Sequence, residues 1–218
     1  ANSFGPPPTR YSTLHEAAAR GMREVCSALL GAAKMARIRD PDVREGSEGN
    51  TALHLAAAYG RTDACQVLLD HARFTAANAQ NHNGQGATAL QVAAMFGHAE
   101  VCRLLLDHSR FTATDAVDEG QNNALHAACG HGHIQVCQVL LEHPRFGGVN
   151  ARGESENTAL VTAALADKVE VAKLILACPR FTALDAGNVN GCTALGSAAW
   201  GRSQDVVRLL LDSPRYTA

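Results

Sequence analysis

A leucine that follows a small polar residue by two positions recurs six times in this chain of 218 residues. The leucines are Leu14, Leu53, Leu90, Leu125, Leu160 and Leu195, separated by 39, 37, 35, 35 and 35 residues. Self-similarity at a period of about 20 to 50 residues is typical of proteins built from stacked repeats. Each repeat in such a protein contacts only its neighbours, so the pattern predicts one elongated body without a central core.

The residues around each leucine predict two short helices joined by a tight turn. The small polar residues suit helix N-caps, because their side chains can accept a hydrogen bond from a free backbone N–H; they are Ser12, Thr51, Thr88, Asn123, Thr158 and Thr193. Leucine and alanines then follow at helical rather than alternating spacing. Glycine ends the first helix at Gly21, Gly60, Gly97 and Gly132, where a left-handed turn is expected. Asp167 replaces it in the fifth copy and the sixth shifts its glycine to Gly201, which leaves the turn geometry there open.

The segment TALHLAAAYGRTDACQVLLDHARFTAANA, from Thr51 to Ala79, resembles the ankyrin repeat. The matching positions are Thr51, Leu53, His54, the Ala56-Ala57 pair, Gly60, the Leu68-Leu69 pair and the Asn78-Ala79 end. Alanine or threonine replaces the family's usual proline before the leucine, and an Arg-Phe pair replaces its Gly-Ala and lengthens the unit to 35 residues. The resemblance covers nearly everything after Tyr11 and implies an all-α, ankyrin-type helix-turn-helix solenoid with projecting hairpin loops.

The domain organisation follows from this period. We expect a Pro-rich arm over residues 1–11 and six stacked repeats over 12–50, 51–87, 88–122, 123–157, 158–192 and 193–218. In ankyrin-like repeats the histidine after the leucine ties adjacent repeats together, which implies a structural role for His15, His54 and His126.

An arginine followed by an aromatic residue stands after the second helix of five repeats: Arg73-Phe74, Arg110-Phe111, Arg145-Phe146, Arg180-Phe181 and Arg215-Tyr216. We expect the rings to be buried plugs over the ends of the helix pairs. The arginines fit two interpretations. They can pair with the carboxylates three residues earlier at Asp70, Asp107, Glu142 and Asp212 and complement the helix dipole, or they can form an anion-binding ridge.

Four cysteines, Cys26, Cys65, Cys102 and Cys137, lie at equivalent positions, twelve residues after their leucines. Packed helices lie about 8–10 Å apart, whereas a disulfide needs Cα atoms within about 7 Å. We therefore expect buried, free thiols, which favours a reducing compartment inside the cell. No CxxC pair is present, so we expect no zinc site.

Charge and motifs argue against several function classes. With 19 basic and 21 acidic residues the net charge is −2, which gives no electrostatic case for nucleic acid or acidic membranes. No apolar run approaches the roughly 20 residues of a membrane span, and no secretory signal is present. No nucleophile, zinc-protease or phosphate-loop motif occurs, so we expect a non-enzymatic chain without cofactor or metal.

The family resemblance implies partner contacts at the exposed end of each first helix, five and six residues after the leucine. The candidate partner-binding residues there are Arg20, Tyr59, Met95, Phe96, His131, Leu165 and Trp200. Packing between first helices is the alternative role for the aromatic members. The last helix is as apolar as the interior copies, so we expect Val206, Val207, Leu210 and Leu211 to be covered by further chain or by another subunit.

The sequence is compatible with three functions. The first is a protein–protein interaction scaffold or adaptor, a subunit of a larger assembly. The second is a regulatory segment of a longer multidomain protein, a hypothesis that fits a chain that starts at Ala1 and stops inside a repeat. The third is an anion or RNA binder that uses the arginine ridge, which a steep loss of binding with salt would support.

Overall fold

The computed structural model describes residues 12–32, 40–44, 47–82 and 86–216, so the predicted arm over 1–11 lies outside it. Within these ranges the chain is all-α, and an isolated antiparallel bridge joins Gln80 to Thr88. Three short 3-10 helices, Ala76–Asn78, Gly148–Asn150 and Glu154–Glu156, interrupt the loops. No helix in the described ranges has the length and apolar character needed to cross a membrane.

The twelve α-helices of these ranges are α1 (Thr13–Ala19), α2 (Arg23–Gly31), α3 (Ala52–Ala58), α4 (Thr62–Asp70), α5 (Ala89–Met95), α6 (Ala99–Asp107), α7 (Ala124–His131), α8 (Ile134–Glu142), α9 (Ala159–Leu165), α10 (Val169–Ala177), α11 (Ala194–Trp200) and α12 (Gln204–Leu211).

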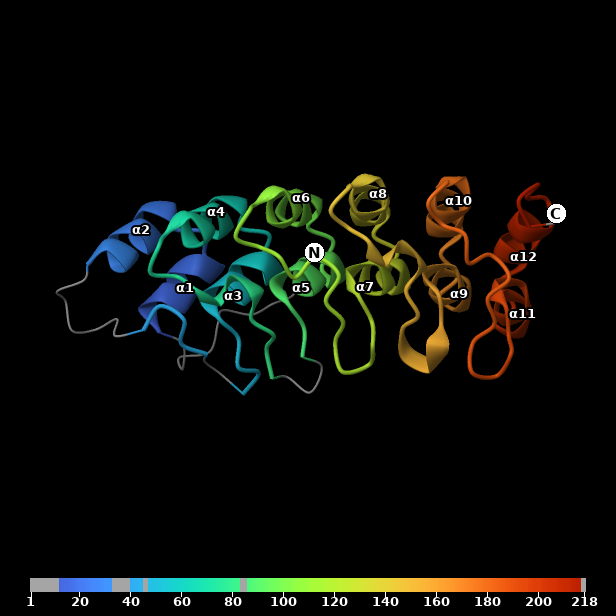
Figure 1. The fold of residues 1–218 in the computed structure, drawn as a ribbon, viewed down its shortest axis with the longest axis horizontal. Coiled ribbons are helices and arrows are strands. Elements are labelled where there is room, and N and C mark those ends of the chain that lie inside the picture. Colours follow the sequence, from blue (N-terminus) through green and yellow to red (C-terminus); the bar gives the residue numbers. More distant parts are fainter. Residues whose placement is uncertain (1–11, 33–39, 45–46, 83–85, 217–218) are drawn as a thin grey trace.

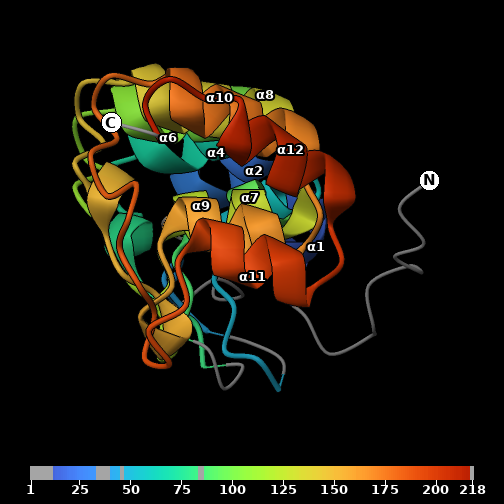
Figure 2. The ribbon, with the colours of Figure 1, turned by 90° about the vertical axis from the view of Figure 1, so that its right-hand side faces the viewer.

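The helices form two layers along one line (Figure 1). The odd-numbered helices pack side by side in one layer and the even-numbered helices in the other, and each odd helix also packs on the even helix that follows it. The loops that connect one helix pair to the next project together beyond the odd-numbered layer, as the end-on view shows (Figure 2). Backbone hydrogen bonds such as Asp118 N to Asn122 O (2.9 Å) and Gly153 N to Asn157 O (2.8 Å) close these loops as hairpins. The predicted solenoid with projecting hairpins is confirmed.

The start and end of each first helix follow the sequence pattern, and the structure settles the turn geometry that the pattern left open. All six small polar residues occupy N-cap positions, as expected. The turn residue is left-handed throughout, with φ between 67° and 81° at the four glycines, 53° at Asp167 and 59° at Arg202. The geometry that the sequence left open in the sixth repeat is thereby resolved: Gly201 is the C-cap at φ −74°, and Arg202 occupies the left-handed position. Stacking against the neighbouring pair imposes the same turn even where a side chain is strained by it.

The aromatic plugs lie in the core. Phe74, Phe111, Phe146 and Phe181 are each 0% exposed, which confirms the expected packing role. The tyrosine at the last equivalent position is half-buried, and its hydroxyl accepts a hydrogen bond from the Leu195 backbone N–H at 3.2 Å. The polar atom of Tyr216 thus satisfies one free donor at the start of α11.

The seven cysteines are free, as expected. Burial raises the pKa of the Cys26 thiol to about 11 and also raises the pKa values of Cys65, Cys102 and Cys129. The Cys129 and Cys137 sulfurs lie 3.8 Å apart, a contact between thiols inside one helix pair. The five buried cysteines act as small apolar groups rather than reactive thiolates, whereas Cys178 is half-buried and Cys192 is exposed.

Candidate functional site

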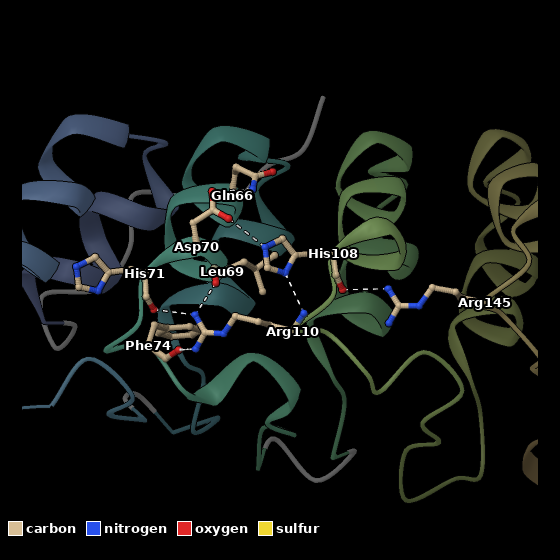
Figure 3. Close-up of polar contacts among 8 residues, drawn as sticks. All are labelled: Gln66, Leu69, Asp70, His71, Phe74, His108, Arg110 and Arg145. Carbon is tan, nitrogen blue, oxygen red and sulfur yellow. Dashed lines mark hydrogen bonds and ion pairs between the residues drawn. The ribbon is translucent and has the colours of Figure 1, made fainter.

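The arginines of the Arg-aromatic pairs reach back to the preceding helix pair. Arg110 donates from Nη1 to the carbonyl oxygens of Leu69 (2.6 Å) and His71 (2.8 Å) and from Nη2 to that of Phe74 (Figure 3). Leu69 lies in the last turn of α4, where a carbonyl lacks a partner within the helix. Equivalent bonds are made by Arg145, Arg180 and Arg215, and Arg73 donates to the Leu30 carbonyl. Each guanidinium therefore caps its neighbour's second helix and joins consecutive pairs.

The expected ion pairs between these arginines and the carboxylates three residues earlier are wrong for the residues that the structure describes. Asp70 instead accepts from His108 Nε2 of the next pair at 3.1 Å, and Asp107 accepts from His143 Nε2 at 3.0 Å. Each arginine lies just after the end of its helix, beside the unpaired carbonyls of the preceding helix pair. Its side chain therefore bonds to those carbonyls and does not turn back to the carboxylate of its own helix. The guanidiniums with three hydrogen bonds each to backbone carbonyls are poorly placed to hold an anion; they belong to Arg110, Arg145, Arg180 and Arg215.

Two further rows of hydrogen bonds join the first helices. His54 Nε2 bonds to the Ala87 carbonyl at 3.0 Å, and Gln91 Nε2 makes the same contact to the Asn122 carbonyl at 2.7 Å. His15 and His126 repeat the pattern, which confirms the expected structural role of the three histidines. At the turns, His133 Nε2 bonds to the Met95 carbonyl at 2.9 Å at the end of α5. These contacts hold the first-helix layer rigid.

The candidate partner-binding residues lie where they were expected, at the C-terminal ends of the first helices, but they differ in exposure. Trp200 is 83% exposed and Leu165 is 41% exposed. Arg20 and His131 are also exposed, whereas Tyr59, Met95 and Phe96 are half-buried. We call this set of seven residues the end row. Its exposed apolar surface is concentrated at the α9 and α11 end of the molecule.

A hollow of about 380 Å³ lies between α7 and α9 on the side of the hairpin loops. Ala127 and Gly130 of α7 and Thr162 of α9 line it along the helices, and Met95, His131 and Leu165 of the end row lie at its helix-end side. Asp118 and Glu154, from the loops before α7 and α9, line the opposite side. We call this space the α7–α9 hollow.

The hairpin loops at the hollow are tied together through one side chain. Asp118 Oδ1 accepts from the Asn122 backbone N–H at 2.8 Å, and Asn122 Oδ1 accepts from the Glu154 backbone N–H at 3.1 Å. Burial holds the pKa of the adjacent His126 below its usual range, so this imidazole is neutral at pH 7. Asp118 and Glu154 both line the hollow, and no lysine or arginine is among the described residues that line it.

The last helix presents less apolar surface than expected. Val206 and Leu210 are 0% exposed, so the expectation that they need an outside cover was wrong. They pack within the chain, since α12 contacts both α10 and α11. Leu211 is 55% exposed, whereas the equivalent Leu176 is 5% exposed under the next pair. Val207 is half-buried, and together with Leu211 it forms what we call the end face.

Comparison with known families is consistent with this architecture. A sequence model described as ankyrin repeats in three copies matches residues 7–78, 73–152 and 147–217. The chain belongs to the ankyrin repeat family. Among solved structures, the ankyrin repeat domain of Bcl-3, described as a unique member of the IkappaB protein family, superimposes with a TM-score of 0.74 at 26% identity, covering 91% of this chain and 81% of that one. No curated protein matches in a sequence search.

Ankyrin repeats are protein–protein interaction modules, and this ankyrin chain fits a non-enzymatic interaction scaffold. Within the described residues, no group of three or more His, Cys, Asp or Glu side chains is arranged to hold a metal ion. The end row and the α7–α9 hollow beside it offer exposed surface on which a partner could dock.

Sequence reasoning missed the two carboxylates of the hollow and the importance of Gly130. The sequence contained a usable signal, because Gly130 stands at the position that carries Met95, Leu165 and Trp200 in other repeats. The proximity of Asp118 and Glu154 could not be read in the same way, since it depends on the Asn122 contact between two loops.

Proposed function

We propose that this ankyrin chain is an adaptor that holds a partner protein along the end row, without chemistry of its own. The observation that carries the proposal is the 83% exposure of Trp200, next to the 41% exposed Leu165 of the preceding first helix. Aromatic side chains dominate the energetics of many interfaces, and an exposed tryptophan has no packing role within the chain. The end face with Leu211 is a second, smaller contact surface in the same proposal.

A rigid scaffold suits this role. Arginine, histidine and glutamine side chains fix each helix pair to the next, so the end row is ordered before a partner arrives. Little conformational entropy is then lost on docking, which leaves more of the contact energy for affinity. Seven free cysteines support our placement of the protein in a reducing compartment.

Trp200 is the only tryptophan of the chain, so its fluorescence tests the proposal directly. Partners captured from a native extract are identified by mass spectrometry and titrated as purified proteins. Docking on the end row is expected to shift the emission to the blue and to protect the ring from iodide quenching. Trp200→Ala and Leu165→Ala are expected to weaken binding by about tenfold or more each, a loss typical of interface hot spots.

Two control variants locate the contact. Ile134, the first residue of α8, is 45% exposed, so Ile134→Ala removes a similar exposed apolar side chain outside the end row. Leu211→Ala reports on the end face. A partner that retains full affinity for the Trp200 and Leu165 variants would contradict docking on the end row.

The regulatory-segment hypothesis describes the same surface acting within a longer chain and predicts the same Trp200 contacts. The arginine-ridge hypothesis receives no support from the contacts, because the guanidiniums bond to backbone carbonyls. Binding to the end row is expected to depend weakly on salt, whereas RNA binding falls steeply.

A further inference from the structure

The α7–α9 hollow exists because one first helix lacks a side chain at its end. The equivalent position is Met95 in α5, Leu165 in α9 and Trp200 in α11, but Gly130 in α7. No close contact requires glycine there: an added Cβ would have Thr162 Cγ2 at 3.7 Å as its nearest neighbour, an ordinary van der Waals distance. Glycine weakens a helix relative to alanine. The consequence of Gly130 is therefore open space in the middle of an otherwise apolar row.

The walls of this space differ at its two ends. Met95 and Leu165 supply apolar surface at the helix ends, and Asp118 and Glu154 supply carboxylates at the loop side. The other titratable groups that face it are His126, which is neutral and bonded to the Asn157 carbonyl, and His131, whose Nδ1 bonds to the Ala127 carbonyl at 2.9 Å. No lysine or arginine is among the described residues that line it.

We propose that the α7–α9 hollow receives the side chain of a lysine or arginine from an extended segment of a partner protein. This inference rests on the proposed function and names the chemistry of the partner. An aliphatic stem would lie along Ala127 and Gly130, which are three residues apart and so about 4.5 Å along the helix. The cationic head then reaches Asp118 and Glu154. A lysine or arginine has this combination of apolar stem and charged tip, and an acidic or purely apolar side chain does not.

The spacing of the end row adds a second requirement for the partner segment. Trp200 stands two helix pairs beyond Gly130 at the equivalent position. Packed helices are about 8–10 Å apart, so the two sites are separated by roughly 16–20 Å. An extended chain rises about 3.3 Å per residue. The basic residue and an apolar residue that contacts Trp200 are therefore about five or six positions apart in the partner.

A random library of 12-residue peptides displayed on phage and selected on the full chain tests this specificity. Enriched peptides are expected to share a lysine or arginine about five or six positions from an apolar residue. The best one is then synthesised with a fluorescent label, and its affinity is measured by anisotropy. Replacing its basic residue by methionine, which retains an apolar stem, is expected to weaken binding by about tenfold, equivalent to one charge-assisted contact.

Three variants of the chain locate the contact. The combined change Asp118→Asn and Glu154→Gln keeps the shape and hydrogen-bonding capacity of both side chains but removes their charge. We expect it to lower the affinity for the labelled peptide by about tenfold and to make that affinity less dependent on salt. Glu119→Gln, on the same hairpin as Asp118 but outside the hollow, is the matched control and is expected to leave affinity unchanged. Gly130→Met fills the space and is expected to weaken binding by about tenfold or more while the melting temperature is maintained or raised.

The outcomes separate this inference from the proposed function. Enriched peptides without a basic residue, or an unchanged affinity after the Asp118 and Glu154 substitutions, would overturn the basic anchor. If Trp200→Ala still weakens the binding of those peptides, the proposed docking on the end row is retained without the basic anchor. If no selected peptide binds more weakly to the Trp200→Ala or Gly130→Met variant, extended segments bind neither the end row nor the α7–α9 hollow, and both proposals are rejected for partners of this kind.

Discussion

At the scale of single residues, stability depends on side chains that fill or satisfy one site in each repeat. Phe111 and Phe146 are 0% exposed in the core, where no neighbouring side chain can replace the ring. We expect Phe111→Ala or Phe146→Ala to lower the free energy of unfolding by about 3–5 kcal/mol, through lost burial and the cavity left behind. Urea denaturation followed by circular dichroism measures it. A loss below about 1 kcal/mol would contradict the plug role.

His54 links stability to pH. Its Nδ1 accepts from the Thr51 backbone N–H at 3.2 Å and its Nε2 bonds to the Ala87 carbonyl, so the folded chain needs the neutral ring. Burial lowers the pKa of His54 from 6.5 to about 4. Between pH 6.5 and 4 the unfolded chain binds a proton at His54 that the folded chain does not bind, so the stability that this residue contributes above pH 6.5 is lost as pH falls towards 4. The expected loss in the free energy of unfolding is at most about 3 kcal/mol.

The variant His54→Gln tests this linkage, because Gln91 already makes the equivalent bond in the next repeat. We expect the variant to lose less stability than the parent between pH 7 and pH 4.5, measured by urea denaturation at both values. His131→Gln changes an exposed imidazole and is the matched control. An identical acid loss in parent and His54→Gln would assign the pH dependence to other groups.

At the scale of helices, the contact between consecutive pairs depends on the arginine caps. Arg145 donates to the carbonyls of Leu106 (2.5 Å), His108 (3.0 Å) and Phe111 (2.6 Å), which belong to α6 and the loop after it. Arg145→Met keeps the stem but leaves these carbonyls unpaired, so we expect a loss of about 2–3 kcal/mol. Arg145→Lys restores the charge without the planar fork and is expected to recover only part of it. Urea denaturation of both variants measures the two losses, and equal stability of parent and Arg145→Met would contradict the capping role.

The elements themselves could be predicted from the sequence because each depends on local spacing. The N-caps, the helical leucine-alanine pattern and the buried phenylalanines recur at fixed positions, and the structure confirms all three. Contacts between pairs could not be predicted in the same way. Asp70 and Arg73 lie three residues apart in the sequence, yet Asp70 pairs with His108 and Arg73 caps Leu30, because residues about one repeat apart become neighbours in the stack.

At the scale of the whole molecule, the core runs as one continuous layer along the stack, and each pair packs only on its neighbours. Stability in such proteins is the sum of local terms and nearest-neighbour interfaces, so the ends open more readily than the middle. The candidate surface follows this geometry. Trp200 and Leu211, which are 83% and 55% exposed, lie near one end, and the α7–α9 hollow lies one helix pair further in, where neighbouring pairs hold its walls in place.

The cysteines allow this uneven stability to be measured along the whole chain. Cys192 is exposed and Cys178 is half-buried, whereas Cys65, Cys102 and Cys137 are 0% exposed in interior pairs. The structure contains seven free cysteines, so we expect all seven thiols to react in denaturant without reductant. Fewer than seven reactive thiols would mean that some are oxidised. In the native protein we expect Cys192 to react at once, Cys178 next, and the interior thiols only when a pair opens, with Cys26 of the first pair ahead of them. Timed alkylation with mass spectrometry of the peptides gives each rate. A single common rate for the buried thiols would mean that the stack opens as one cooperative unit, and would contradict the nearest-neighbour account.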